Sequence, residues 1–301
     1  MRSPVRGPDG LTASLFAVAV VIGGSNFLAV RLSNLELPPF WGAGLRFTLA
    51  GLAFLAITAV LRLTLPRGRA LLLMAAFGVL GIAGFYALMY WALLSVTAGV
   101  ATVVMAIVPL VTLLLAGAQG LERIRARSVA GASLAVAGIA WLALEPGRIS
   151  LPLGALLAMI GAVLCVSQSI IVGKRLQQHH PAVINAVALV VGAAVLVTLS
   201  AVAGEPWALP RRPEAAWALA YLVTFGSVGL FFALLTVIRR WTASATSYLF
   251  VLFPVATMAL EALLFGEPVT VAAGAAALLV MSGVWFGALA PDRPPADAAT
   301  A

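Results

Sequence analysis

Long apolar stretches without a charged residue alternate along this chain with short segments that carry the charges. Between Asp9 and Arg31, and again between Arg69 and Glu122, no side chain carries a formal charge. A helix needs about 20 apolar residues to cross a bilayer, so the second stretch has room for two helices. The pattern predicts ten membrane-spanning helices, over residues 11–31, 38–61, 70–93, 98–118, 128–145, 151–173, 181–203, 215–237, 243–265 and 269–290.

The composition of the 301 residues agrees with a lipid environment. Apolar residues make up 63% of the chain and charged residues only 9%, and the mean hydropathy is +1.11. A soluble domain carries roughly 25% charged residues. The chain has too few polar groups to cover a water-facing surface, which excludes soluble globular, collagen-like, coiled-coil and disordered proteins. We therefore expect an all-α polytopic membrane protein in contact with a lipid bilayer.

The basic residues indicate how the chain is oriented. With a cytoplasmic N-terminus, thirteen Lys and Arg residues fall on the cytoplasmic side and four on the outer side. Cytoplasmic loops carry such an excess, so both termini are predicted to be cytoplasmic. Residues 1–10 then form a cytoplasmic tail, and the polar, Pro-rich residues 291–301 form a disordered one. Because the basic residues cluster at helix ends, the net charge of +8 does not indicate a nucleic-acid partner.

The chain is similar to itself when it is shifted by 145 residues. The shift pairs, without a gap, Gly81 with Gly226, Gly84 with Gly229, Thr97 with Thr242, Pro109 with Pro254, Glu122 with Glu267 and Gly138 with Gly283. We infer two units of five helices, residues 11–146 and 147–290. Because five is odd, the second unit enters the membrane from the opposite side, and such inverted repeats serve alternating access in transporters. A duplication kept only for packing is the other interpretation.

Three segments carry a family resemblance, GGSNFLAVR from residue 23, PPFWGAGLRF from residue 38 and FGVLGIAGFYAL from residue 77. Together with a mid-helix proline and a closing glutamate in each unit, they resemble the EamA family of the drug/metabolite transporter superfamily over residues 11–290. The resemblance implies a secondary transporter of the inner membrane, commonly an exporter of amino acids or other small metabolites, and is nearest to the aromatic amino-acid exporters. The sequence departs from the family at Ile22, where Trp is frequent, and its second unit has no match to Arg46.

Charged side chains inside the spans are candidate functional groups, because charge is costly in lipid. Arg46 lies about 12 Å below the outer end of its helix, near the depth of Asn26. Either Arg46 attracts a carboxylate of the substrate, or it ties the first two helices together with Asn26 as an acceptor. Glu261 is either a proton-coupling carboxylate or cation site, or a structural group that reaches the interface or pairs with Arg31 or Arg46.

Two prolines and a set of weakly polar residues complete the candidates. Pro109 and Pro254 each remove a backbone donor near the middle of a span, so they are either paired hinges or adaptations to packing. An aromatic, weakly polar cavity wall suits an amphipathic neutral ligand. The predicted substrate-binding residues are Asn26, Tyr86, Tyr90, Gln168, Ser244 and Tyr248, with Tyr90 alternatively an anchor at the membrane interface.

Motifs of other functional classes are missing from the sequence. Aspartates occur only in the tails, and no HExxH, GxSxG or Walker A motif is present. We therefore expect no enzyme, no ATP-driven pump, no cofactor and no metal site. A channel would usually show a charged or carbonyl-rich filter. With the direction taken from the family resemblance, the predicted function is export of small metabolites, with neutral or aromatic amino acids first among them, by alternating access. Export or import of other amphipathic metabolites or drugs is the alternative.

Overall fold

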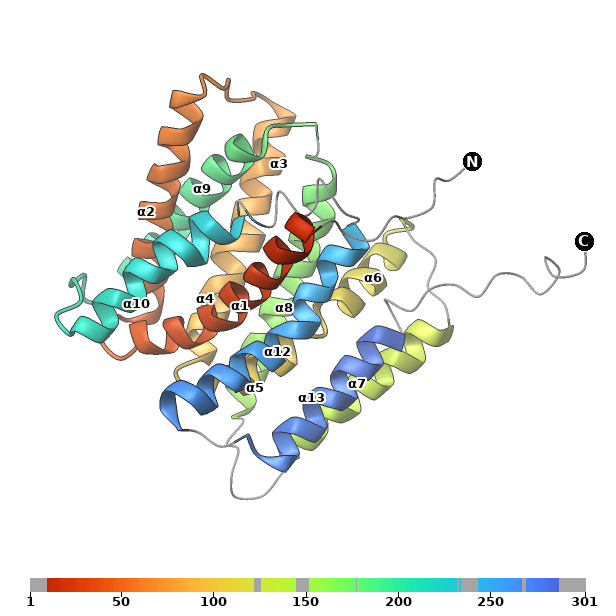
Figure 1. Cartoon of the computed structure of the whole chain (residues 1–301). Helices are drawn as coiled ribbons and strands as arrows, with labels where there is room; N and C mark the ends of the chain where they lie inside the picture. Colours follow the sequence, from red (N-terminus) through yellow and green to blue (C-terminus); the bar gives the residue numbers. More distant parts are fainter. Residues whose placement is uncertain are drawn as a thin grey trace, which may run out of the picture.

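The structure is a computed structural model that describes residues 10–121, 126–144, 152–176, 178–231, 233, 243–266 and 269–286, with the backbone alone at 128, 142–144 and 243–248. Every regular element in these residues is helical, and each of the ten predicted spans contains helix (Figure 1). The elements are α1 (Gly10–Ser33), α2 (Pro39–Val60), α3 (Arg69–Gly78), η1 (Val79–Gly84), α4 (Phe85–Ala92), α5 (Ala98–Met105), α6 (Val108–Ala118), α7 (Ala126–Leu144), α8 (Leu153–Lys174), α9 (Pro181–Val202), α10 (Pro213–Val223), η2 (Thr224–Gly229), α12 (Ala243–Phe265) and α13 (Val271–Val284).

The predicted all-α membrane fold is confirmed. By length and composition, six helical stretches of the described residues can cross a bilayer, namely Gly10–Ser33, Pro39–Val60, Arg69–Ala92, Ala98–Ala118, Leu153–Lys174 and Pro181–Val202. Shorter apolar helices cover Val129–Trp141, Leu249–Phe265 and Val271–Val284. The predicted tails 1–10 and 291–301 lie outside the described residues, except for Gly10, as does the predicted boundary between the two units.

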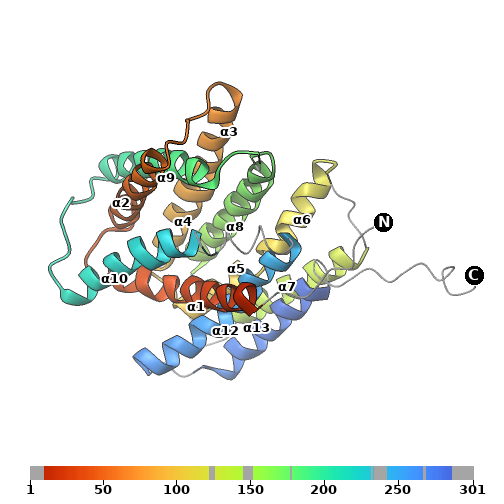
Figure 2. The same cartoon turned by 45° about the horizontal axis from the view of Figure 1, so that its top comes forward.

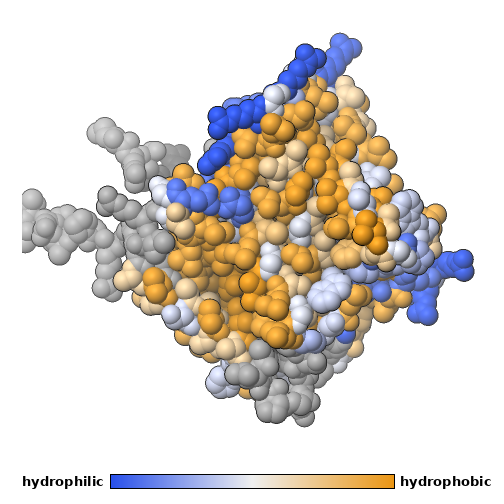
Figure 3. All heavy atoms as spheres, turned by 180° about the vertical axis from the view of Figure 1, so that it is seen from behind, coloured by the Kyte–Doolittle hydropathy of each residue, from blue (hydrophilic) through white to orange (hydrophobic). Residues whose placement is uncertain are grey.

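The outward-facing surface of the bundle is apolar, as contact with lipid requires. Figure 3 shows hydrophobic residues over most of one face, with hydrophilic residues gathered at its margins. Leu52 of α2, Leu157 of α8 and Leu278 of α13 are each more than half exposed. A water-soluble monomer rarely exposes a continuous apolar surface of this kind.

Helices related by the 145-residue shift make equivalent contacts. Helix α1 of the first unit packs against α12 and α10 of the second unit. Its counterpart α8 of the second unit packs against α6 and α4 of the first unit. The pairs α2 with α9 and α7 with α13 each join one unit to the other, and they lie at opposite edges of the bundle (Figures 1 and 2). Such an exchange of partners is the contact pattern expected of two related five-helix units.

Two short π-helical segments, which the sequence did not predict, interrupt corresponding helices of the two units. Val79–Gly84 and Thr224–Gly229 are separated by the same 145 residues as the other paired positions. A π turn bonds i to i+5 and locally disturbs the regular ladder of the α-helix, which is why such turns are frequent at functional sites. The paired glycines Gly81 and Gly226 occupy the same place in the two segments.

The helices enclose one another more completely at one end of the bundle. We call this the first end, and it contains the connections 33–39, 92–98, 202–213 and 265–271. All eight residues of α5, which begins at the first end, are buried. The third span runs from α3 at the opposite end to α4 at the first end. Six of the eight residues of α4 are buried, whereas only Met74 and Gly78 are buried among the ten residues of α3. The bundle is therefore tightly packed at the first end.

Candidate functional site

Arg46 is the centre of a buried polar cluster that four spans build. Its side chain has no exposed surface. Nε donates to Oγ of Ser227 at 3.0 Å, and Nη2 donates to the carbonyl of Gly226 at 3.0 Å. Nη1 donates to Oη of Tyr90 at 3.4 Å. We call Asn26, Arg46, Tyr86, Tyr90 and the Gly226–Ser227 pair the Arg46 cluster.

The main acceptor of this cluster lies in the π segment of the eighth span. The carbonyl of Gly226 accepts from Nη2 of Arg46 and also, at 3.2 Å, from Nδ2 of Asn26 on α1. A Cβ at position 226 would collide with Oδ1 of Asn26 and lie 3.3 Å from Nη2 of Arg46. Only glycine therefore allows α1, α2 and η2 to meet here without rearrangement.

Two aromatic rings lie close to the guanidinium of Arg46. Cζ of Arg46 lies 4.8 Å from the ring centroid of Phe47 and 5.1 Å from that of Tyr86. The rings of Phe47 and Tyr86 pack edge to face, with centroids 4.5 Å apart. Cation–π attraction is strongest at desolvated sites, so these rings offset part of the cost of burying the charge.

The hydrogen-bond partners of the buried Arg46 are all uncharged. Among the described residues, no acidic side chain forms an ion pair with it. A guanidinium has five N–H donors, and three are used, so two remain. Beside it, Oδ1 of Asn26 is a buried acceptor with no hydrogen-bond partner in the described part of the chain. The cluster thus holds a positive charge with spare donors next to an unused acceptor.

The structure brings four predicted residues together and corrects two interpretations. Asn26, Arg46, Tyr86 and Tyr90 all belong to the Arg46 cluster. Arg46 does not tie the first two helices through an acceptor on Asn26, because the amide of Asn26 donates to the same carbonyl as Arg46 does. Tyr90 is fully buried, so the interpretation as an interfacial anchor is wrong. Sequence reasoning missed Ser227, although its place beside the repeated Gly226 was a usable signal.

The other predicted binding residues do not join this cluster. Oε1 of Gln168 on α8 accepts from Nε2 of Gln119 at 2.8 Å, close to the end of α6. The side chains of Ser244 and Tyr248 lie outside the described residues. Within those residues, no group of three His, Cys, Asp or Glu side chains is placed to hold a metal ion.

Glu261 is buried and caps the start of α5. Oε1 accepts from the backbone amide of Ala98 and Oε2 from that of Gly99, each at 2.8 Å. Nη1 of Arg31 lies 3.6 Å from Oε1, so the predicted pairing with Arg31 is present. With 6% of its surface exposed, Glu261 does not reach out to the interface. A carboxylate suits this place because the helix dipole and the free amides favour negative charge.

The two prolines have different surroundings. The span 98–118 is interrupted at residues 106–107, between α5 and α6, and Pro109 lies in the first turn of the new helix. Pro254 lies inside the continuous helix α12. The break places the carbonyl of Val108 3.3 Å from Oγ of Ser167 on α8, which donates to it. A hinge role for either proline stays a prediction.

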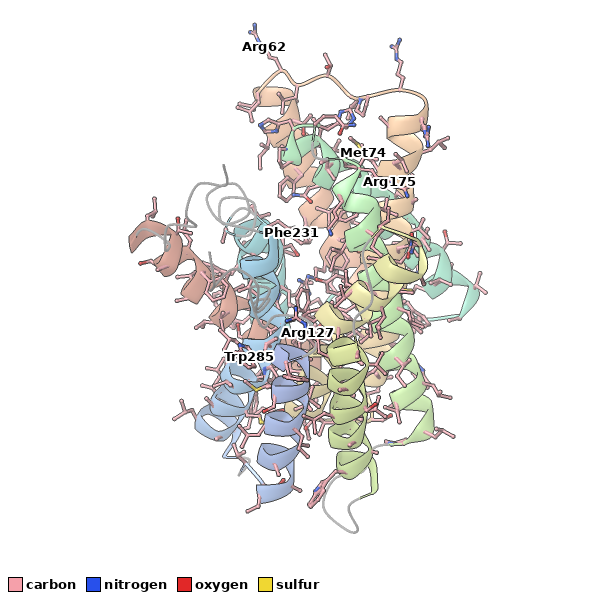
Figure 4. The ribbon with its side chains drawn as sticks, turned by 90° about the vertical axis from the view of Figure 1, so that its right-hand side faces the viewer. Arg62, Met74, Arg127, Arg175, Phe231 and Trp285 are labelled. Atoms are coloured by element: carbon pink, nitrogen blue, oxygen red, sulfur yellow. The ribbon has the colours of Figure 1, made fainter. Side chains whose placement is uncertain are left out.

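Basic side chains lie at the end of the bundle opposite to the first end. Figure 4 shows Arg62 at one extremity and Met74 and Arg175 below it, whereas Arg127, Phe231 and Trp285 lie further toward the middle. Arg62 follows α2 and Arg175 follows α8, at helix ends opposite to the first end. Basic residues therefore mark the end that the sequence analysis assigned to the cytoplasm.

Comparison with known proteins gives a consistent result. The sequence matches the EamA-like transporter family over residues 10–144 and again over 152–288. It is 32% identical over 259 residues to the uncharacterized inner membrane transporter YedA of Escherichia coli (strain K12), covering 85% of this chain and 83% of that protein. It is 28% identical over 301 residues to a probable amino-acid metabolite efflux pump of Salmonella typhimurium, covering 92% and 94%. A crystal structure with 21% identity covers 92% of this chain and 96% of its own, with a TM-score of 0.66, which shows a shared fold.

Proposed function

We propose, on the premise that the chain belongs to the EamA-like transporter family, that this transporter exports neutral amino acids and similar amphipathic metabolites by alternating access. Members of this family are transporters and not enzymes. Export and the amino-acid class have support from the Salmonella relative, whose name describes a probable amino-acid metabolite efflux pump. The observation that carries the substrate class is the charge balance of the Arg46 cluster.

The Arg46 cluster is complementary to the head group of an α-amino acid. A buried arginine without a carboxylate partner is unusual, because burial of a charge is costly unless it is paired. A substrate carboxylate supplies that partner through the two N–H donors that Arg46 does not use. The unused Oδ1 of Asn26 accepts from the substrate's ammonium group. A zwitterion satisfies both groups and brings no net charge into the membrane.

Aromatic amino acids are the favoured members of this class. Three aromatic rings lie in or beside the Arg46 cluster, those of Tyr86, Tyr90 and Phe47. A contact between two aromatic rings contributes about 0.5–1.5 kcal/mol beyond the burial of area. Substrates with a ring therefore gain affinity over aliphatic ones of similar size.

We further propose that the protein lies in the inner membrane with both termini in the cytoplasm. The location follows that of the relative YedA, and the orientation follows the basic residues. In this orientation the first end of the bundle faces the outside. The Arg46 cluster then lies toward the outer half of the membrane, since Arg46 is seven residues from the start of α2.

Counterflow in reconstituted vesicles tests the substrate class directly. Vesicles loaded with unlabelled phenylalanine should take up labelled phenylalanine in a saturable way, and threonine should compete more weakly. In bacteria that overproduce the protein, a toxic analogue of a neutral amino acid should accumulate less and inhibit growth less. Increased sensitivity means import, and no effect across the neutral amino acids removes this substrate class.

A further inference from the structure

Two connections at the first end of the bundle bind to each other. Residues 33–39 join α1 to α2, and residues 202–213 join α9 to α10. Oε2 of Glu36, in the first connection, accepts from the backbone amides of Arg211 and Arg212, each at 2.8 Å. These two amides lie directly before α10 begins. A carboxylate from one connection therefore fixes the start of the helix that follows the other.

The second connection makes the same kind of contact in return. Oε1 of Glu205 accepts from the amide of Phe40 at 3.2 Å, and Oε2 accepts from that of Trp41 at 2.7 Å, in the first turn of α2. The rings of Trp41 and Trp207 stack with centroids 5.3 Å apart and 7° between their planes. Hydrogen bonds with an ionised acceptor are about twice as strong as neutral ones. We call these contacts, together with those of Glu36, the clasp.

The helices that the clasp joins are also packed closely along their length. A Cβ on Gly44 of α2 would lie 3.0 Å from Cγ2 of Val197 on α9, and one on Gly51 would lie 3.4 Å from Cγ2 of Val190. Small residues allow membrane helices to approach one another in this way. Helix α10 in turn packs against α1 and α2. The clasp therefore fastens α1, α2, α9 and α10 into one unit at the first end.

The Arg46 cluster is divided between this unit and α4. Asn26 lies on α1, Arg46 on α2 and Gly226 in η2, which continues α10, so all three belong to the fastened unit. The carbonyl of Gly226 accepts at 3.0 Å from Arg46 and at 3.2 Å from Asn26. Tyr86 and Tyr90 lie on α4, and the bond from Arg46 to Oη of Tyr90 is longer, at 3.4 Å. The groups proposed to bind the substrate's head group are thus held by the clasp, whereas the tyrosines are not.

The third span leaves this unit at its π segment. Helix α3 and η1 pack against α9, whereas α4 packs mainly against α8. A Cβ on Gly192 of α9 would lie 2.5 Å from Cβ of Ile82 in η1, so the span is held tightly at that point. π turns are frequent where helices bend and at functional sites. Beyond η1, Nδ2 of Asn34 donates to the carbonyl of Tyr90 at 2.9 Å and joins the end of α4 to the end of α1. We call the contact of α4 with α1 and α2 the seam.

We propose that the clasp stays closed throughout the transport cycle, and that the first end opens at the seam, where Tyr90 parts from Arg46. Glu36 and Glu205 are then positioning residues. They fix the starts of α10 and α2, and through these helices they fix the distance between Arg46 and the carbonyl of Gly226. The inference rests on the proposed alternating access. It does not depend on which substrate is carried or on which side of the membrane the first end faces.

Two buried serines at the first end are matched reporters for the clasp and the seam. Ser33 ends α1 at the seam, since a Cβ on Gly42 would lie 3.5 Å from Oγ of Ser33 and 3.7 Å from Cε1 of Tyr90. Ser200 lies under the clasp, where its Oγ accepts from Nε1 of Trp207 at 3.1 Å. Both serines are 0% exposed. Replacement by cysteine changes one atom, so each reporter keeps the shape of the residue that it replaces.

Thiol labelling in lipid nanodiscs measures which of the two contacts opens. Ser33→Cys and Ser200→Cys are made in a Cys165→Ala background, and Leu35→Cys, 60% exposed at the same end, is the reference. A hydrophilic reagent reaches both faces of a nanodisc, so the result does not depend on orientation. We expect Ser33→Cys to react at least about tenfold faster than Ser200→Cys, because only the seam opens in a populated minor state. Equal rates, or faster reaction of Ser200→Cys, overturn the proposal.

Two further variants make the labelling specific. Tyr90→Phe removes the bond to Arg46 across the seam and should raise the rate at Ser33→Cys about threefold to tenfold, with no change at Ser200→Cys. Glu205→Gln takes an acceptor from the start of α2 and should raise the rate at Ser200→Cys, which shows that this reporter responds when the clasp is weakened. If Tyr90→Phe raises both rates equally, the first end opens as one piece and the clasp proposal is wrong.

Covalent closure of the clasp gives a second measurement. Leu35→Cys and Arg212→Cys replace exposed side chains on the two connections, next to the bonds of Glu36. A bifunctional thiol reagent that bridges them should leave phenylalanine counterflow at the rate of the unbridged protein. Loss of counterflow after bridging, with restoration when the bridge is cleaved, overturns a clasp that stays closed. Absence of counterflow before bridging would instead contradict the amino-acid assignment, and the labelling rates, which need no substrate, would still decide the clasp.

Discussion

At the scale of single residues, two buried charges are stabilised by different kinds of partner. Glu261 has backbone amides and the guanidinium of Arg31 around it, so its charge is matched inside the protein. Arg46 has a serine, a tyrosine, a backbone carbonyl and two aromatic rings, and all of them are neutral. This contrast separates a structural carboxylate, whose charge the protein itself matches, from a cation that has capacity for an anionic ligand.

Replacement of Arg46 tests this assignment. A hydrogen bond to a charged group typically contributes 1.5–3 kcal/mol, so Arg46→Gln should raise the KM for phenylalanine about tenfold to a hundredfold. Inhibition by the corresponding amine, which lacks the carboxylate, should stay unchanged. Arg69→Gln, at an exposed position where α3 begins, is the control. It should change neither the KM for phenylalanine nor the inhibition by the amine. Equal weakening of the amino acid and the amine would assign Arg46 a structural role.

At the scale of the elements, the paired π segments connect the repeat to the site. Residues 79–84 and 224–229 have the same place in the two units, but within the described part of the chain only the second is bonded to an arginine. Gly81 faces Ser169 instead, since a Cβ there would lie 2.8 Å from Oγ. The two units therefore share their backbone irregularity and differ in the polar groups that meet it.

Substitution of Gly226 measures how much this irregularity contributes to stability. Gly226→Ala places a Cβ against Asn26 and Arg46, and an overpacked core typically loses about 1–3 kcal/mol. We expect a lower melting temperature in detergent and weaker substrate binding. Gly274→Ala, within α13 and with no atom within 4 Å of the added Cβ, should leave the melting temperature unchanged or raise it. Similar melting curves for both variants would contradict a tightly packed π segment.

The two prolines, paired in the sequence, should differ in their effect on exchange. Pro109→Ala allows α5 and α6 to fuse across residues 106–107, so we expect slower exchange with little change in KM. Pro254→Ala lies within a continuous helix and should slow exchange less. Counterflow rates and half-saturation values of both variants distinguish these effects. A Pro109→Ala variant that loses binding while exchanging at the normal rate would contradict a hinge.

The long apolar stretches and the spacing of the charges predicted the helices more completely than the site. The predicted span 98–118 agrees with the helical stretch Ala98–Ala118, which Thr97 caps at its start. The π segments were not predicted, since the same apolar residues can form either α or π turns. Nor did the sequence indicate that Ser227 and the Gly226 carbonyl would be the partners of Arg46. These partners are neutral and lie 181 and 180 residues away along the chain, and only the tertiary packing brings them within reach.

At the scale of the whole molecule, the packing is unequal between the two ends. The first end is enclosed around α5, and basic residues such as Arg62 and Arg175 lie at the opposite end (Figure 4). If the first end faces outside, the structure is closed to the outside.

The orientation that this interpretation requires is open to a direct test. Reporter fusions at Gly10 and after Pro291 should both read cytoplasmic, because ten spans return the chain to the side from which it starts. Leu94→Cys, 51% exposed at the first end, should react with an impermeant reagent in spheroplasts, and Leu65→Cys, 53% exposed between α2 and α3, should react only after the membrane is opened. The cysteine pair is independent of the fusions and leaves both tails intact. One terminus reading outside would contradict an even number of spans. The reverse labelling pattern would place the enclosed end on the cytoplasmic side.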